Sequence, residues 1–113
     1  MKKIEAIVRK DKIEGIIKAL KEVEVQEIMM TKVIGYGKQN GHIKLLEGEN
    51  ETIIFSQKIN LEIFVMDNQV EQVINILIQE ARTGSVGDGK ITVYPLTDMY
   101  SYNGKTHFAV NYA

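Results

Sequence analysis

The chain contains no cysteine and has a single proline among its 113 residues. The lack of cysteine excludes disulfide bonds, thiolate metal ligands and cysteine nucleophiles. No apolar run is long enough for a membrane span or a signal peptide. The 14 basic and 15 acidic residues nearly cancel, which disfavours a nucleic-acid binder because phosphate contacts need a surplus of Lys and Arg. We expect a cytoplasmic protein that binds no nucleic acid and meets a membrane only through a partner.

The apolar residues divide the chain into two similar halves within a single domain, residues 1–113. Each half has a strand pattern, a helical stripe and a second strand pattern, at residues 2–9, 12–23 and 27–36 and again at 58–66, 68–81 and 90–96. Asp11 is expected to cap the first helix, and Asp67 or Asn68 the second. This order predicts an α+β fold, a ferredoxin-like βαββαβ sandwich with both helices on one sheet face.

Two further features concern the outside of this sandwich. The strand patterns at 26–36 and 58–66 are apolar enough to favour a covered open face, and hence an oligomer, over a monomer with an exposed apolar face. In the tail, Asn103-Gly104 stands between strand-forming residues. Because this pair tolerates positive φ angles, it predicts a C-terminal β-hairpin over about 98–110 with a type I′ turn.

Two connections between the predicted elements have features that suggest a function beyond joining those elements. Residues 83–90 read Thr-Gly-Ser-Val-Gly-Asp-Gly-Lys, and three glycines so close can turn successive N–H groups into one anion-binding concavity, with Lys90 adding a charge. A plain tight turn is the alternative. The connection at 37–57 is long for a compact domain. It is either an interaction arm ordered by a partner or ligand, or a floppy insertion.

Four segments occur here in the order found in one known family. Residues 1–8 resemble its first strand, residues 35–42 (Gly-Tyr-Gly-Lys-Gln-Asn-Gly-His) the entry into its T-loop, residues 58–63 the strand that leaves this loop, and residues 81–91 (Ala-Arg-Thr-Gly-Ser-Val-Gly-Asp-Gly-Lys-Ile) its B-loop signature. The match is without gaps to about residue 96. The chain is thereby identified as a member of the PII signalling protein family, with a T-loop at about 37–57 and a B-loop at about 82–90.

The resemblance implies a homotrimer with ligand sites between subunits, which binds ATP or ADP and, with Mg-ATP, 2-oxoglutarate. It implies a signalling protein rather than an enzyme, which regulates nitrogen-metabolism proteins through its T-loop. For the nucleotide it implies contacts from Met29, Gly37, Lys38, Gln39, Phe64, Gly87, Asp88, Gly89 and Lys90. For 2-oxoglutarate it implies Gln39, Lys58 and Gly87, with Gln39 also beside Mg²⁺. A dianionic acid beside a metal needs such a cation and amide.

The sequence also departs from the family pattern. No Tyr lies between Tyr36 and Tyr94, which excludes uridylylation at the usual loop tip. The tip carries Glu47, Glu49 and Glu51, with Ile53, Ile54 and Phe55 behind it, and these six residues are expected to bind a basic or apolar site on a target transporter, enzyme or regulator.

The nucleotide site departs as well. Compared with the family pattern, Met29 and Glu27 change the pocket that is expected to hold the base of the nucleotide. No Arg follows Arg82, where the family supplies two to the phosphates. Because a charge-assisted bond contributes about 1.5–3 kcal/mol, we expect shifted nucleotide affinity. The alternative is a PII-like module that binds AMP, a cyclic nucleotide or bicarbonate to control a transporter or metabolic complex.

Overall fold

The computed structural model describes residues 1–38, 46–47, 52–85 and 87–105, with the backbone alone for residues 36–38, 46–47, 52–56 and 105. The main elements are β1 (Lys2–Val8), α1 (Ile13–Leu20), β2 (Glu27–Lys38), β4 (Thr52–Val65), α2 (Val70–Ala81) and β5 (Lys90–Pro95). Shorter elements are the 3₁₀ turns η1 (Lys10–Lys12) and η2 (Asp67–Gln69) and the strands β3 (Leu46–Glu47), β6 (Tyr100–Ser101) and β7 (Gly104–Lys105).

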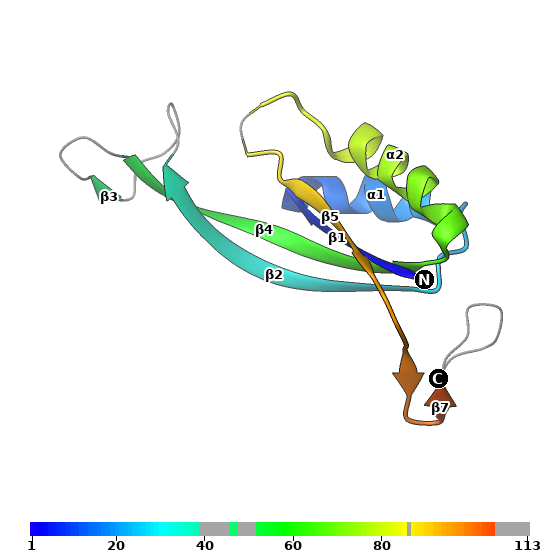
Figure 1. Cartoon of the computed structure of the whole chain (residues 1–113). Coiled ribbons are helices and arrows are strands. Elements are labelled where there is room, and N and C mark those ends of the chain that lie inside the picture. Colours follow the sequence, from blue (N-terminus) through cyan, green and yellow to red (C-terminus); the bar gives the residue numbers. More distant parts are fainter. Residues whose placement is uncertain (39–45, 48–51, 86, 106–113) are drawn as a thin grey trace.

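The four long strands form one antiparallel sheet in the order β2-β4-β1-β5. Both helices cover the same face of this sheet and leave the other face open (Figure 1). Two β-α-β units whose strands interleave in this order define the ferredoxin-like sandwich. The α+β fold predicted from the sequence is therefore confirmed.

The core lies between the helices and the sheet because strand residues alternate between its two faces. Alternate residues are buried against the helices from Ile4 to Val8 in β1 and from Ile59 to Val65 in β4, while the intervening residues face the open side. The most buried side chains are Ile4, Ala6, Val8, Ile16, Leu20, Leu61, Ile63, Val65, Val73 and Leu77. The helical stripes and strand alternation that predicted the fold thus meet in a single core.

The long connection is shorter than the sequence indicated. We expected a loop over about 37–57 and a strand from Lys58, but β2 continues to Lys38 and β4 begins at Thr52. The backbone pairs run on through Phe55 with Tyr36 and Ile53 with Lys38. The physical reason is that the β-forming run at 53–55 extends the antiparallel ladder instead of remaining outside it.

A C-terminal hairpin is present over Tyr100–Lys105, and residues 106–110 of the predicted one lie outside the described residues. The predicted turn is wrong. Strand residues Ser101 and Gly104 pair directly, so the turn residues are Tyr102 and Asn103 rather than Asn103 and Gly104. A type I′ turn needs positive φ at both central residues. Neither Tyr102 nor Asn103 has a positive φ, whereas Gly104, the residue after them, does. The Ser101 hydroxyl accepts a hydrogen bond from Asn103 N, at 3.2 Å, and this contact favours the observed turn.

The predicted helix caps are also wrong. Asp11, Asp67 and Asn68 lie inside the 3₁₀ turns that precede α1 and α2, and neither helix has a side-chain N-cap bond among the described contacts. Gln69 stabilises the start of α2 instead. Its Oε1 accepts a bond from Met66 N at 2.9 Å, and its Nε2 donates to Val23 O at 3.0 Å. It therefore ties α2 to the turn that follows α1, where Glu24 has a φ of 58°.

We predict that Gln69→Ala lowers the free energy of unfolding by about 1–2 kcal/mol, because it leaves a backbone donor and acceptor without partners. Gln79→Ala, an exposed change in α2, is the matched control and should cost less than about 0.5 kcal/mol. Urea unfolding measures both at one protein concentration, since an oligomer's stability depends on concentration. Equal stability of the two variants would contradict this role.

Candidate functional site

The glycine-rich turn between α2 and β5 adopts a backbone that its sequence permits. Gly84, Gly87 and Gly89 have φ angles of 84°, 94° and 106°, which side-chain-bearing residues rarely adopt. At Gly89 the neighbouring strand also comes close, because a Cβ built there would lie 1.7 Å from Ile7 O. The turn thus lies against the end of β1, and only glycine fits this contact.

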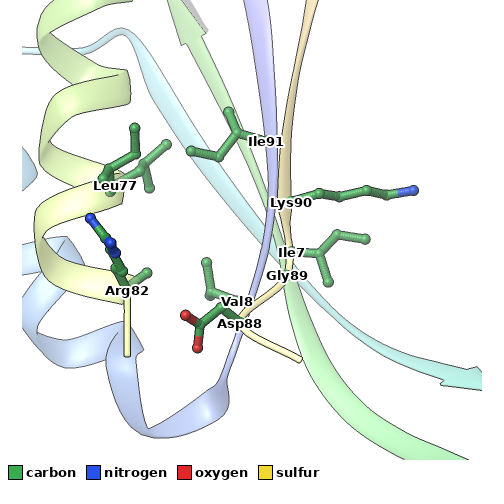
Figure 2. Close-up of a pocket in the computed structure, with 10 residues that line it drawn as sticks. Ile7, Val8, Leu77, Arg82, Asp88, Gly89, Lys90 and Ile91 are labelled. Atoms are coloured by element: carbon green, nitrogen blue, oxygen red, sulfur yellow. The ribbon is translucent and has the colours of Figure 1, made fainter. Parts of the chain in front are cut away.

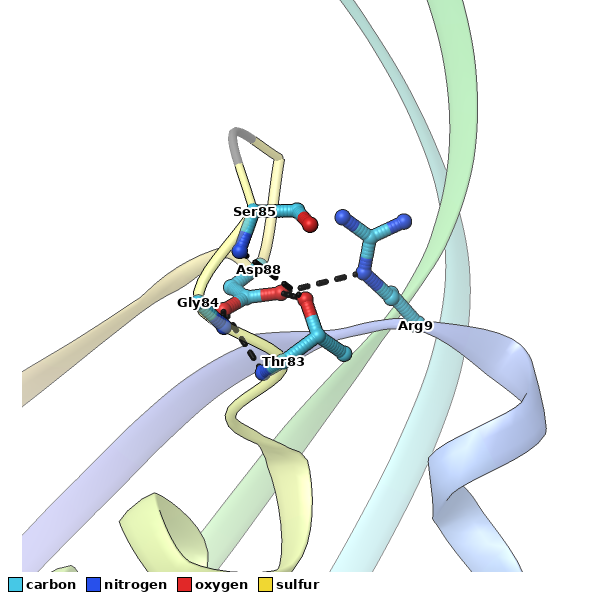
Figure 3. Close-up of polar contacts among 5 residues, drawn as sticks. All are labelled: Arg9, Thr83, Gly84, Ser85 and Asp88. Carbon is cyan, nitrogen blue, oxygen red and sulfur yellow. Dashed lines mark hydrogen bonds and ion pairs between the residues drawn. The ribbon is translucent and has the colours of Figure 1, made fainter.

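Asp88 holds this turn together through its carboxylate (Figure 3). Oδ2 accepts bonds from Thr83 N at 2.8 Å and Gly84 N at 2.9 Å, and Oδ1 accepts from the Thr83 hydroxyl. Arg9 Nε adds a bond to Oδ1 at 3.2 Å. The bonds from Thr83 and Gly84, followed by that from Arg9, keep the pKa of Asp88 well below its ordinary value. Asp88 therefore acts on the shape of the turn.

Two cations border the turn at Gly87. A Cβ built on this residue would lie 3.4 Å from Arg9 Nη2 and 3.6 Å from Lys58 Nζ. Burial, together with the nearby Arg9 charge, lowers the pKa of Lys58. An anion placed beside Gly87 would meet both charges and restore the stability of the Lys58 ammonium. The turn, the residue that follows β1 and a residue of β4 thus bring two cations to one point of the backbone.

Arg9 is a site residue that the sequence reasoning missed. It follows β1 directly, where it looked like a solvent-facing charge at the end of a strand. Its tertiary contacts place it between Asp88 and Gly87. The only signal in the sequence was a cation positioned at the carboxyl-terminal end of a strand, which is too common to be diagnostic.

A cavity of about 180 Å³ lies beside the turn, between α2 and the strands β1 and β5. Figure 2 shows that Leu77 and Arg82 lie on the α2 side of the strands, whereas Lys90 extends to the opposite side. This volume is below the roughly 300–1,000 Å³ of sites that enclose a drug-sized ligand. The cavity alone cannot enclose a nucleotide.

The remaining predicted contacts lie farther along the open face of the sheet. Phe64 is six residues from Lys58 on β4, about 20 Å along the strand, and Glu27 is its partner on β2. Met29 lies on the edge strand β2 and is 49% exposed, whereas Lys90 lies on the opposite edge strand, β5. The single chain therefore brings Lys58, Gly87, Asp88 and Gly89 together, but it does not bring Met29 and Phe64 to them.

Charged residues in the middle of the open face pair with one another. Lys3 Nζ lies 3.2 Å from Glu62 Oε2 and 3.6 Å from Glu5 Oε2, and Tyr94 donates to Glu5 Oε1 at 3.2 Å. The bond to Glu62 raises the pKa of Lys3. Nearby, Asn60 Oδ1 is buried and has no hydrogen-bond partner among the described residues. A face whose charges are neutralised in pairs can pack against another protein surface at a lower desolvation cost.

Other predicted residues belong to the arm formed by β2 and β4. The structure gives the backbone of Gly37 and Lys38 at the end of β2, of Glu47 in β3, and of residues 53–55 in β4. Gln39, Glu49 and Glu51 lie outside the described residues. No helix in the described ranges is long and apolar enough to cross a membrane, and those ranges contain no acidic or histidine cluster suited to a metal ion.

Fold and site together define a class: a ferredoxin-like domain with a glycine-rich, cation-bordered turn and a protruding β-ribbon. The family model of the nitrogen regulatory protein P-II matches residues 1–105. The chain is 42% identical over 94 residues to the P-II protein of Pasteurella multocida, covering 83% of this chain and 84% of that protein.

Two further comparisons agree. The P-II protein of Azospirillum brasilense is 39% identical over 99 residues, covering 88% of each chain. The solved structure of B. subtilis GlnK superposes with a TM-score of 0.73 at 29% identity, covering 88% of this chain and 87% of that one. The chain belongs to the nitrogen regulatory protein P-II family, and its role is that of a PII-type signalling protein.

We predict that Gly89→Ala unfolds or severely destabilises the protein, by more than about 3 kcal/mol, because the new Cβ overlaps Ile7 O. Gly84→Ala is the matched control, since Gly84 also has a positive φ but no atom of the described residues lies within 4 Å of the place its Cβ would take. It should cost about 1–2 kcal/mol. Urea unfolding of both variants measures the difference, and equal losses would show that the contact with β1 is unimportant.

We also predict that Asp88 contributes to acid sensitivity. Because its folded pKa lies below the ordinary value of 3.8, its stabilisation is complete above that value and is lost as the pH falls toward the lowered pKa. Asp88→Asn should therefore unfold with a shallower pH dependence than the natural protein below about pH 5. Circular dichroism during acid titration measures this, and parallel curves would contradict it.

Proposed function

We propose that this PII-type protein senses ATP or ADP at the glycine-rich turn, and 2-oxoglutarate beside it, and that it regulates nitrogen-metabolism proteins through its β2–β4 arm. The observation that carries the proposal is the convergence of Arg9 and Lys58 on Gly87. An opening of the backbone bordered by two cations suits a multiply charged anion better than a neutral ligand. A role without catalysis is part of the proposal.

The separation of the site residues favours a ligand site shared between copies. Lys90 lies on edge strand β5, and Met29 on edge strand β2. A compact ligand can meet the turn of one copy and the base pocket around Met29 and Phe64 of another if these edges adjoin. Such a head-to-tail contact closes into a ring when the rotation between copies is a whole fraction of a turn. We propose the homotrimer that the family resemblance implies, with the open faces of the sheets turned inward.

Lys58 is the proposed partner of the 2-oxoglutarate carboxylate. Its ammonium lies beside Gly87, which gives the acid a cation next to backbone N–H groups. The Gln39 amide oxygen is a hard ligand of the kind that Mg²⁺ accepts, and the ion would take its other ligands from phosphate and carboxylate oxygens. This arrangement would couple the acid to the nucleotide, because both share the metal.

The β2–β4 arm is the proposed contact with target proteins. Its two strands continue beyond the part of the sheet that the helices cover (Figure 1), and the molecule measures 55 × 27 × 20 Å as a result. The arm leads from the Gly87 site, through Lys58 on β4, to the acidic segment at 47–51. Ligand contacts at its base can therefore change how the tip meets a partner.

Isothermal titration with ATP, ADP and AMP, each with and without Mg²⁺ and 2-oxoglutarate, tests the ligand proposal. Binding of ATP or ADP, with 2-oxoglutarate binding only when Mg-ATP is present, would support it. If no adenine nucleotide binds while the oligomer persists, a different small ligand such as bicarbonate is favoured. Light scattering after gel filtration tests assembly, and a monomer would overturn the shared site.

We predict that Lys58→Gln weakens 2-oxoglutarate binding by about tenfold to hundredfold, the loss expected for one charge-assisted bond. ATP binding should weaken less than 2-oxoglutarate binding, because Arg9 also borders Gly87 and keeps its charge. Lys21→Gln, which removes an exposed charge, is the control. Because the pKa of Lys58 lies below 10.5 before binding, 2-oxoglutarate affinity should begin to fall at a lower pH than an ordinary lysine would give. Titrations from neutral pH to about pH 10 measure this, and a flat profile would contradict it.

A further inference from the structure

A second hollow, of about 330 Å³, lies at the base of the arm, where β2 and β4 pass η1. Its polar lining comes from Lys10, Lys32 and Gln57, and its apolar lining from Val33, Ile34 and Ile59. Lys58 completes the wall. None of these lining residues is acidic. The hollow therefore combines cationic and amide donors with an apolar surface.

The fold places these donors together from three separate elements. Lys32 on β2 is the register partner of Ile59 on β4, and Gln57 is the partner of Ile34. Lys10 enters from η1, the turn that follows β1. The register thus brings two lysines and an amide to one hollow although they are 22 to 47 positions apart in the chain.

The two lysines have no compensating charge in the described part of the chain. Each ion pair found among the described residues involves other groups, and neither Lys10 nor Lys32 lies within 4.0 Å of a described carboxylate. Both lysine side chains are exposed and border the same hollow, so a bound anion would meet two ammonium groups that no described carboxylate pairs with. Their arrangement therefore favours occupation by an anion.

We propose that this hollow, here called the stem pocket, binds a small oxyanion, a phosphate or a carboxylate with a short apolar part. The two ammonium groups and the Gln57 amide supply donors for the oxygens. Ile34 and Ile59, which lie on the same face of the two strands as Lys32 and Gln57, accommodate the apolar part. The volume lies within the range of small-ligand sites. The stem pocket is distinct from the glycine-rich turn because side chains alternate along a strand: Lys32 and Ile59 share one face, whereas Lys58, whose Nζ lies beside Gly87, points to the other.

An NMR titration of the full-length, ¹⁵N-labelled protein tests the stem pocket. Inorganic phosphate and butyrate are added separately, in a buffer without magnesium or nucleotide. Saturable shifts of the backbone amides of Lys32, Val33 and Ile59 with either probe support the site, and the stronger probe identifies the preferred head group. Absence of such shifts at high millimolar concentration overturns it. Shifts confined to Gly87 and Gly89 overturn it too, because the anion then binds only at the glycine-rich turn.

Charge variants provide the second measurement. Lys10→Gln and Lys32→Gln should each weaken probe binding about tenfold, and Lys32→Glu should abolish it. Lys18→Gln, an exposed change on α1, should leave it unchanged. ATP affinity should be the same in all these variants, so failure of the stem pocket is distinguishable from failure of the nucleotide site. Probe binding that survives Lys32→Glu overturns the proposal, and circular dichroism verifies folding.

Discussion

The contact between Asp88 and the backbone of the turn is the constraint on which the candidate site depends. A run with three glycines has many accessible conformations, and ordering it costs conformational entropy. The Asp88 carboxylate fixes Thr83 and Gly84 by hydrogen bonds and holds Arg9 from the end of β1. The same carboxylate therefore defines the shape of the turn and the place of one of its two bordering cations.

The position of the glycine-rich turn in the fold connects it to the strands of the sheet. Gly89 lies against Ile7 O, so the turn is in contact with the central strand β1. Lys58, on the neighbouring strand β4, borders Gly87 and also stands at the base of the arm. An event at Gly87 thus acts on a residue whose strand continues into the arm. Such continuity places the turn and the arm on one paired strand, which connects them in space.

The sequence predicted what depends on periodicity and failed where tertiary contacts decide. The alternation around Leu61 and the helical stripe through Leu77 located the core, since burial selects those patterns directly. The start of β4 was misplaced because the run at 53–55 could extend a ladder only once β2 was known to be its partner. The predicted helix caps were wrong because Gln69 stabilises α2 through a distant turn.

The candidate site shows the same division between what periodicity predicts and what tertiary contacts decide. Its glycines could be recognised, because a positive-φ backbone leaves glycine as its trace in the sequence. Arg9 could not, since nothing local distinguishes it from any charge at a strand end.

Two sites near the base of the arm contain cationic side chains. The sites differ in whether a carboxylate pairs with those side chains. At the glycine-rich turn, Asp88 balances Arg9 before any ligand binds. At the stem pocket, no described carboxylate balances Lys10 or Lys32. A ligand at the first site competes with an existing ion pair, which makes binding sensitive to geometry, whereas a ligand at the proposed second site meets ammonium groups that no described carboxylate pairs with. The first arrangement favours selectivity, and the second favours a response to the general concentration of small anions.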